Sequence, residues 1–529
     1  MRTPRWAAAA LAALLGISLA GPATAPPAAA APSEPAGTGQ GYWSAEGDQL
    51  VDADGDPVRM TGINWFGSET DTFAPHGLWE RNLDSMVEQM AGLGFNTIRL
   101  PYSNEALDAG SVPNGIDFSV NPELEGLSGV EILDEVIASA GEHGMRVLLD
   151  RHRPSASSQS ALWYTDAHPQ SEWIADWKML AERYAGNPTV IGADLHNEPH
   201  STSDGTGACW GCGDPARDWR LAAEEAGNAI LEVNPDWLIV VEGVDCVAGT
   251  GAPECGWWGG NLSGAAEYPV RLSNPDKLVY SAHEYATSVA MQDWFEDPDF
   301  PANMPALWDH FWGYLENEDR APVLLGEFGT TLQDSRDQVW LQDLMSYLGQ
   351  GTSGIDFTYW SWNPNSGDTG GILQNDWRTV DQDKYSYVEP YLSPTSPGDG
   401  DGTGGGDGDG DGDGGGGDTD PPAGTACTVD YSVANSWDGG FTADVVLTNS
   451  GDEAITDWTL TWTAPDGVQV TSGWGADVSQ SGDTVTAAAP DWASTLDAGA
   501  SASIGFQATG PASPQPEDFR TGGTSCSGS

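Results

Sequence analysis

Two glutamates of this sequence stand at the ends of apolar stretches, where a carboxylate has a chemical use. Glu198 follows Asn197 near the end of VIGADLHNEPH, and Glu327 stands near the end of PVLLGEFGT. Placing polar groups at the mouth of a buried strand is unfavourable unless a reaction or a ligand uses them. Two facing carboxylates can protonate a leaving oxygen and stabilise an oxocarbenium-like centre, as hydrolysis of a glycosidic bond requires.

We therefore predict that the two glutamates face each other across a sugar-binding cleft. Glu198 suits the acid and base, because its amide neighbour can hold a sugar hydroxyl, and Glu327 suits the nucleophile. His196 and His200 lie in the first stretch. This chemistry requires no role for either, and we expect both to be supporting structure.

Other residues at strand ends could support the pair. Arg99 can keep the nucleophile ionised, and His283 and Tyr285 can hydrogen-bond in the cleft, so that the two carboxyls are held at different pKa values. Trp360 can form the floor under the sugar. Each of these residues alone is more often structural, since an arginine at a strand end is usually part of an ion pair. Their combination is what indicates a site.

The elements that must position these residues form a regular series. Between residues 44 and 362, apolar runs alternate with amphipathic segments that end in Gly or Asn-Pro. Polar residues collect at the carboxyl ends of all predicted strands after the first, except the fifth. Eight strands separated by helices predict a (β/α)8 TIM barrel, whose active site lies on that face. A doubly wound open sheet is the competing fold, but no glycine-rich phosphate loop follows any strand. The predicted strands are VRMTGINWF, FNTIRLP, MRVLLDRH, VIGADLHNEP, WLIVVEG, LVYSAHEY, PVLLGEFG and GIDFTYWSW.

Composition divides the chain into four parts. Residues 1–31 combine early arginines with an Ala/Leu run and small-residue sites, which predicts a secretory signal peptide and a secreted, extracellular protein. Residues 41–392 hold the barrel. Residues 393–424 are Gly, Asp, Pro, Ser and Thr, which predicts a flexible linker extended by charge repulsion. Calcium binding by its Asp-Gly run is an alternative, but the apolar anchors of a folded calcium repeat are absent.

Residues 425–529 change to a period of two, which predicts an antiparallel β-sandwich. Trp458 and Trp462 share one strand face and are expected in its core. Trp437, Trp474 and Trp492 stand in Gly/Asp/Pro-rich turns instead. Exposed tryptophans on a rigid β scaffold can stack on sugar rings, and we predict this role for these three.

One acidic stretch near the amino terminus has two interpretations. VDADGDPV spaces Asp52, Asp54 and Asp56 like a calcium loop. The bidentate glutamate and the flanking helices of such a loop are missing, and Asp54-Gly55 between apolar runs is a turn signal. We expect a hairpin here.

The charge is strongly acidic, with 79 Asp and Glu residues against 19 Lys and Arg, a net of −60. Lysine occurs only at Lys178, Lys277 and Lys384. Self-repulsion of this size destabilises a compact fold in dilute salt and is screened in concentrated salt. We expect a halophilic protein, with an ordinary acidic secreted enzyme as the alternative. Nucleic acid is an implausible partner, and no later stretch is apolar enough to span a membrane.

The six cysteines agree with export, since they fall into three pairs. The CxxC of Cys209 and Cys212 could be a redox or zinc motif, but it lies in a Gly-rich loop with no second ligand pair nearby. We predict disulfides Cys209–Cys212, Cys246–Cys255 and Cys427–Cys526, no metal and no cofactor.

Several stretches resemble the secreted bacterial endoglucanases of glycoside hydrolase family 5. They cover most of residues 41–391 and include GINWFG, NTIRLPYS, DRHRP, DLHNEPH, CWGCGDP, WWGGN, YSAHEYATS, LGEFGTTL and YWSWNPNSGDTGGIL. The resemblance implies a (β/α)8 barrel and a retaining mechanism with the two glutamates in the roles assigned above. By motif position it also implies supporting roles for Arg99, His152, Asn197, His283, Tyr285 and Trp360, and cleft-lining positions for Trp258 and Trp210.

The C-terminal part resembles a family 2 carbohydrate-binding module, beginning at CTVDYSVANSWDGGFTADVVLTN. Trp437, Trp474 and Trp492 match the three surface tryptophans of the cellulose-binding type. The expected protein is a monomeric endo-β-1,4-glucanase that acts on cellulose and is tethered to it by this module. The alternatives are activity on mannan or xyloglucan, and a non-catalytic carbohydrate-binding protein.

Overall fold

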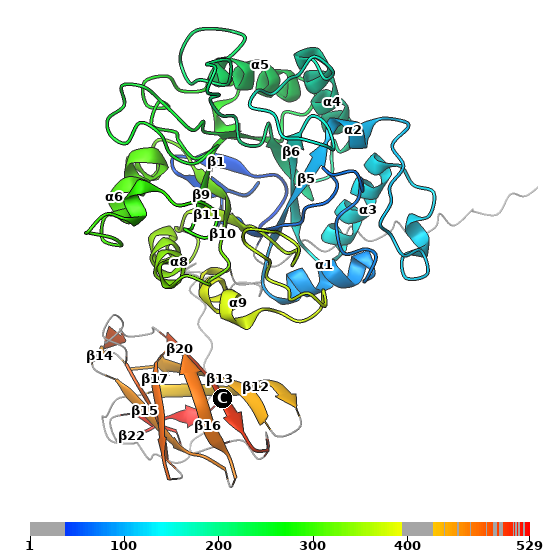
Figure 1. The fold of residues 1–529 in the computed structure, drawn as a ribbon. Coiled ribbons are helices and arrows are strands. Elements are labelled where there is room, and N and C mark those ends of the chain that lie inside the picture. The colour runs from blue at the N-terminus through cyan, green and yellow to red at the C-terminus, as the bar shows by residue number, and fades with distance from the viewer. Residues whose placement is uncertain are drawn as a thin grey trace, which may run out of the picture. The chain divides into compact units, whose positions relative to one another are not determined.

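The computed structural model describes residues 38–393 and, with gaps, residues 427–528. Its contacts divide the chain into two units, Met1–Gly402 and Thr403–Ser529, each described by itself (Figure 1). The predicted signal peptide and the predicted linker after Ser393 lie outside the described residues. Within the described ranges, no helix has both the length and the apolar character needed to cross a membrane.

The first unit is a closed barrel of eight parallel strands, which confirms the predicted fold (Figure 1). Neighbouring strands pair in chain order, and the last strand pairs with the first. Side chains alternate between the interior and the helices, so that Ile98 and Leu100 pack outward while Arg99 between them is buried in the barrel. The strands are β4 (Thr61–Asn64), β5 (Thr97–Ser103), β6 (Arg146–Arg153), β7 (Val190–Asp194), β8 (Leu238–Glu242), β9 (Leu278–Tyr285), β10 (Val323–Gly329) and β11 (Asp356–Tyr359).

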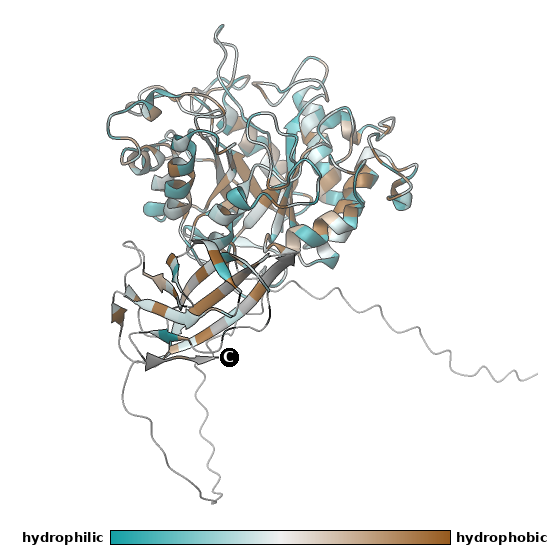
Figure 2. Cartoon of the chain, turned by 60° about the horizontal axis from the view of Figure 1, so that its bottom comes forward, coloured by the Kyte–Doolittle hydropathy of each residue, from teal (hydrophilic) through white to brown (hydrophobic). Residues whose placement is uncertain are grey.

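Helices cover the outside of the barrel and bury one apolar face each. In Figure 2 the barrel strands carry hydrophobic colouring and the helices carry both kinds. The predicted helices are confirmed, and their starts use local caps such as Asn82, whose side chain accepts from the Ser85 amide. A further helical stretch between β9 and β10 was not predicted. The helices are α1 (Leu83–Gly92), α2 (Asn104–Leu107), α3 (Gly129–Glu142), α4 (Gln170–Arg183), α5 (Trp219–Leu231), α6 (Met304–Trp308), α7 (Tyr314–Asn317), α8 (Ser335–Leu348) and α9 (Gln382–Val388).

A three-stranded sheet of β1 (Ser44–Glu46), β2 (Gln49–Val51) and β3 (Pro57–Val58) precedes the barrel. Strands β2 and β3 form the predicted hairpin, and the Asp52 carboxylate accepts the backbone N–H groups of its turn. Trp43, Leu50 and Val58 of this segment share one buried cluster with inward residues of the barrel strands. The sheet therefore closes the end of the barrel opposite to the strand carboxyl ends.

The described residues of the second unit form two five-stranded sheets and a two-stranded one, which confirms an all-β domain. Trp458, Leu460 and Trp462 are buried in its core, as predicted. Among the strands of this unit that the structure describes, the pairing is antiparallel except that β23 runs parallel to β12. The main strands are β12 (Cys427–Trp437), β13 (Gly440–Asn449), β15 (Thr459–Thr463), β16 (Gln469–Trp474), β17 (Asp477–Ser481), β18 (Thr484–Ala488), β20 (Ser501–Thr509) and β23 (Ser527–Gly528).

Candidate active site

The predicted glutamates lie together at the carboxyl ends of the barrel strands. Glu198 follows β7, and Glu327 lies in β10. The register between β9 and β10 shifts between Leu325 and Glu327, so Gly326 forms a bulge that redirects the glutamate. A Cβ atom at Gly326 would lie 2.6 Å from the Ser281 hydroxyl, so the close approach requires glycine.

Both oxygens of Glu327 are held by hydrogen-bond donors. Arg99 Nη1 donates to Oε1 at 2.6 Å, and the Tyr285 hydroxyl donates to Oε2 at 2.6 Å. The side chain is 4% exposed, so these bonds act where water does not compete. Two donors therefore hold both oxygens of this carboxylate in fixed positions, as attack on a substrate carbon requires.

Glu198 is held at its main chain and at both oxygens. Its φ of 52° places it in the left-handed region, which is unusual for a residue with a side chain. His283 Nδ1 lies 3.1 Å from Oε1, and Gln159 Nε2 donates to Oε2 at 2.8 Å. Burial alone would raise the pKa of Glu198, but the hydrogen bonds and charge of His283, with Gln159, outweigh burial and lower it. The carboxylate is therefore the favoured form in the substrate-free site.

The two carboxylates are close enough to act on one bond. One oxygen of Glu198, one ring nitrogen of His283 and one oxygen of Glu327 lie within 4.8 Å of one another. Carboxyl groups about 5–5.5 Å apart are typical of retaining glycosidases, whereas inverting enzymes need about 6.5–9.5 Å to admit a water molecule. This spacing supports the retaining mechanism.

Beneath the pair, one guanidinium contacts four carboxylates. Arg99 lies within 2.6 to 3.1 Å of Asp150, Asp194, Glu242 and Glu327. Burial raises the pKa of Asp150 and Asp194 to about 6 each, although Arg99 opposes it. In the described residues, the sets of groups close enough to hold a metal ion all belong to this cluster. Arg99 contacts at least one carboxylate of each set, so it already supplies the positive charge that a cation would bring.

An aromatic floor lies beside the carboxylates. The Trp360 ring stacks on His152 and on Phe66, with ring centroids 5.5 and 5.3 Å apart. His152 Nδ1 lies 2.6 Å from Asp150 Oδ2, and burial lowers the pKa of His152 to about 3, so its ring is neutral. These residues line a cavity of about 650 Å³, which is large enough for part of an oligosaccharide. Asn197, Gln159, Trp258 and Tyr285 also line it.

Trp258 forms an exposed wall of the cavity. Its side chain is 46% exposed and stacks on His200 with centroids 3.8 Å apart and planes 4° apart. Trp210 is placed differently from the prediction. It is 5% exposed, packs in the core with its ring beside that of Tyr280 in β9, and donates its indole N–H to the Tyr268 carbonyl, so it does not line the cavity.

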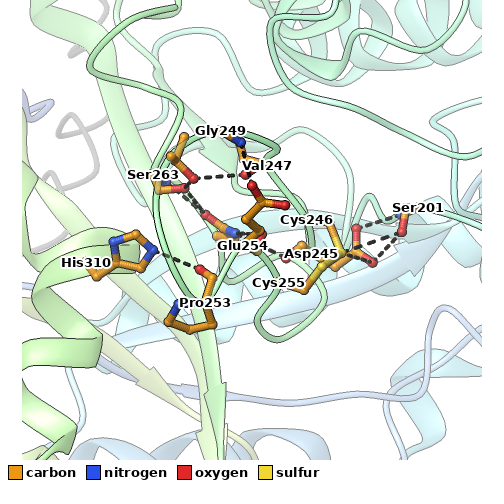
Figure 3. Close-up of a disulfide and its surroundings, with 12 residues drawn as sticks. Ser201, Asp245, Cys246, Val247, Gly249, Pro253, Glu254, Cys255, Ser263 and His310 are labelled. Carbon is orange, nitrogen blue, oxygen red and sulfur yellow. Dashed lines mark hydrogen bonds between the residues drawn. A yellow bond between two sulfur atoms is a disulfide. The ribbon is translucent and has the colours of Figure 1, made fainter.

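The wall is attached to a disulfide-closed loop that follows β8 (Figure 3). Cys246 and Cys255 are bonded and pair as an isolated β-bridge. Asp245, directly before this disulfide, accepts both the backbone N–H and the hydroxyl of Ser201 at 2.7 Å each (Figure 3). The loop that carries the wall is thus tied to the segment that carries Glu198. The pairs Cys209–Cys212 and Cys427–Cys526 are also bonded.

Four residues of this cluster, Asp150, Gln159, Asp194 and Glu242, were not predicted from the sequence. The fifth strand was expected to supply none, which is wrong, because β8 ends at Glu242 and this side chain is buried in the site. Glu242, Asp150 and Asp194 are carboxylates within apolar strands, the same signal that identified Glu327. Gln159 stands in a Ser-rich loop whose sequence carries no such signal. His196 is buried against Arg151 and Ser160, as expected of supporting structure.

The tryptophans predicted for the C-terminal binding face can be placed only in part. Trp437 and Trp474 are the last residues of β12 and β16, so they end strands rather than standing in turns, because the pairing with β13 and β20 extends to them. Trp492 lies outside the described residues. The stacking role of Trp437, Trp474 and Trp492 on sugar rings stays a prediction.

Comparisons with known proteins agree with this geometry. Residues 51–366 match the family described as cellulase (glycosyl hydrolase family 5), and residues 427–526 match the cellulose binding domain family. An endoglucanase of Paenibacillus polymyxa is 50% identical over 358 residues, which cover 67% of this chain and 88% of that protein. The major extracellular endoglucanase of Xanthomonas campestris is 42% identical over 479 residues, covering 89% and 95%. The structure of a hyperthermophilic endocellulase from Pyrococcus horikoshii is 43% identical, covers 68% of this chain and all of that one, and has a TM-score of 0.63.

Proposed function

Because this chain belongs to the cellulase family, glycosyl hydrolase family 5, we propose that it hydrolyses internal β-1,4 bonds of cellulose with Glu198 as the acid and base and Glu327 as the nucleophile. The observation that carries the assignment is the pair of carboxylate oxygens within 4.8 Å of each other at the floor of the cavity. Relatives named endoglucanase support the substrate class.

In the first step, Glu327 attacks the anomeric carbon while Glu198 gives a proton to the departing glycosidic oxygen. The C–O bond to the leaving sugar breaks, and an ester forms between Glu327 and the glucosyl unit. The donors Arg99 and Tyr285 on Glu327 fix the direction of its lone pairs. Oδ1 of Asn197 accepts from Arg99 at 3.1 Å, which orients the amide so that its NH₂ can donate to a hydroxyl next to the reacting carbon.

In the second step, Glu198 takes a proton from a water molecule whose oxygen attacks the anomeric carbon. Glu327 leaves as a carboxylate, and the product keeps the β configuration because two inversions have occurred. The lowered pKa of Glu198 suits this base role. For the acid role, a bound sugar chain must exclude water and take the place of Gln159, so that burial raises the proton affinity of Glu198.

The experiment that tests the substrate compares the release of reducing ends from carboxymethyl-cellulose and from mannan. Release from the cellulose derivative alone, with internal cleavage of cello-oligosaccharides, supports the proposal. Release from mannan alone would refute it in favour of the alternative glycanase. A Glu327→Gln variant should lose about 10⁴-fold or more in kcat and still bind cellulose, because binding by the module does not need the nucleophile. Unchanged activity would contradict the assigned nucleophile.

We also propose that the C-terminal unit holds the enzyme on cellulose by stacking Trp437, Trp474 and Trp492 on glucose rings. Arg520 is the one basic residue of this unit, so charge contributes little to binding. Alanine replacement of these tryptophans should abolish binding to crystalline cellulose without changing hydrolysis of soluble cello-oligosaccharides. Export by the N-terminal segment and a monomeric state complete the proposal, and N-terminal sequencing of the extracellular protein and light scattering test them.

A further inference from the structure

Two carboxylates, Glu242 of β8 and Asp245 of the loop after it, accept backbone N–H groups of the segment that carries Glu198, the proposed acid/base. Glu242 Oε2 accepts the backbone N–H of Glu198 at 2.7 Å, and Asp245 Oδ1 accepts that of Ser201 at 2.7 Å. Glu198 needs such a restraint, because the left-handed backbone conformation is unfavourable for a residue with a side chain. The Glu242 side chain is fully buried, so water does not compete with its hydrogen bond to the Glu198 N–H.

Glu242 differs from Asp245 in what its other oxygen faces. Oε1 lies 3.1 Å from Arg99 Nη2 and 3.3 Å from His283 Nε2. The opposite nitrogen of His283, Nδ1, is the one that lies 3.1 Å from Glu198 Oε1. Glu242 thus contacts the acid/base twice, directly through the backbone and indirectly through the imidazole.

Glu242 itself is fixed in place. Its side chain is fully buried, and its carbonyl accepts the indole N–H of Trp219 at 2.8 Å, which anchors the end of β8. A Cβ atom at Gly259 would lie 2.5 Å from Oε2, so glycine at that position leaves the space that the carboxylate occupies. These contacts restrict where the Glu242 carboxylate can lie.

We propose that Glu242 is a positioning residue for the acid/base glutamate. It holds the backbone of Glu198 in its left-handed conformation. Its carboxylate, beside His283, also retains the proton that His283 and Glu198 share. This inference rests on the proposed function, because it takes Glu198 to be the acid and base.

The charges around His283 support the second half of the proposal. Burial alone would lower the pKa of His283, but the charges of Glu242 and Glu327 outweigh burial and raise it well above its ordinary value. Burial raises the pKa of Glu242 to about 8, although the charges of His283 and Arg99 oppose it, so Glu242 and His283 hold one proton between them. Removing this carboxylate lowers the affinity of the coupled His283–Glu198 pair for that proton. The charged groups that face Glu242 are Arg99 of β5, Asp194 of β7, His283 of β9 and Glu198; Glu327 of β10 faces His283, and Asp150 of β6 faces Arg99.

Two variants separate the two contributions. Glu242→Gln keeps an oxygen that can accept the Glu198 N–H and removes the charge. We expect the alkaline limb of its kcat/KM profile to move to lower pH by about one unit, because the shared proton is held less tightly. Glu242→Ala removes both contacts. We expect its kcat/KM to fall about 100-fold on cellotetraose and less than tenfold on dinitrophenyl cellobioside, whose leaving group needs no proton.

Two matched variants control the experiment. Asp245→Asn alters the other carboxylate that accepts a backbone N–H of this segment. Asp245 does not contact His283, so the alkaline limb of the kcat/KM profile should stay in place whatever happens to kcat. Asp356→Asn alters a buried carboxylate that accepts the Met60 N–H at the opposite end of the barrel. This substitution should change the melting temperature and leave both limbs of the kcat/KM profile in place.

The inference is overturned if Glu242→Gln has the wild-type alkaline limb, or if Glu242→Ala loses activity equally on both substrates, as a merely structural residue would. If Glu242→Ala does not fold, the position of the alkaline limb in the kcat/KM profile of Glu242→Gln decides whether the inference stands. Glu198→Ala tests the proposed function separately. It must discriminate between the two leaving groups, and azide should restore turnover on the activated substrate by attacking the anomeric carbon in place of water. If Glu198→Ala shows neither effect, the proposed function fails; if it shows both and Glu242 variants do not respond, only this inference fails.

Discussion

The Tyr285 hydroxyl donates to Oε2 of Glu327 at 2.6 Å, on the oxygen opposite to the one that Arg99 holds. Oε2 also lies 3.6 Å from His283 Nδ1. The proposed nucleophile is therefore fixed from both sides before a substrate arrives, which is the preorganisation that lowers the barrier of a displacement reaction.

Replacing Tyr285 with phenylalanine should slow both steps, because one donor to the charged carboxylate is lost while the ring remains. A hydrogen bond to a charged group is worth about 1.5–3 kcal/mol, which corresponds to a loss of roughly 10–150-fold in kcat. Steady-state kinetics on cellotetraose measures this. Tyr347→Phe is the matched control, because it removes a hydroxyl of α8 that donates to the Asp309 carboxylate and does not line the cavity. Equal losses in both variants would contradict a specific role for Tyr285.

The stacked pair of Trp258 and His200 predicts an effect on binding rather than on chemistry. Trp258→Ala should raise KM for cello-oligosaccharides roughly 5–30-fold, because a sugar ring loses about 1–2 kcal/mol of apolar contact, while kcat changes little. His200→Ala should raise KM less, since the indole stays but loses the ring behind it. A fall in kcat at unchanged KM would contradict this assignment.

The buried carboxyl of Glu284 predicts how stability depends on pH. Burial raises the pKa of Glu284 from 4.5 to about 8, although the indole N–H of Trp257 opposes it. A group whose folded-state pKa is raised contributes fully below its unfolded pKa, and its contribution is lost as the pH rises through the folded value, at about 1.4 kcal/mol per pH unit. Stability should therefore fall between pH 5 and 8, and Glu284→Gln should show a flatter curve of melting temperature. Parallel curves for the two proteins would refute this explanation.

The charge distribution predicts a response to salt. Two of the three lysines, Lys277 and Lys384, are 6% exposed and hold backbone carbonyls inside the first unit, so they do not offset the acidic surface. With a net charge of −60, screening should raise the melting temperature and the activity as NaCl increases from dilute to molar. Sucrose, which carries no charge, is the control. A flat or falling response to NaCl would leave the acidity unexplained by salt adaptation.

The sequence by itself determined the alternation of strands and helices, the barrel, and the two glutamates, because periodicity and a carboxylate at a strand end are local signals. Glu242 carries the same local signal, but only the tertiary structure decided that it belongs to the site, since its partners Arg99, Glu198 and His283 come from distant strands. The structure also decided that Trp258 faces the cavity and Trp210 the core. Both are tryptophans in Gly-rich loops, and the direction of a loop depends on the packing of the whole barrel, which no short stretch of sequence encodes.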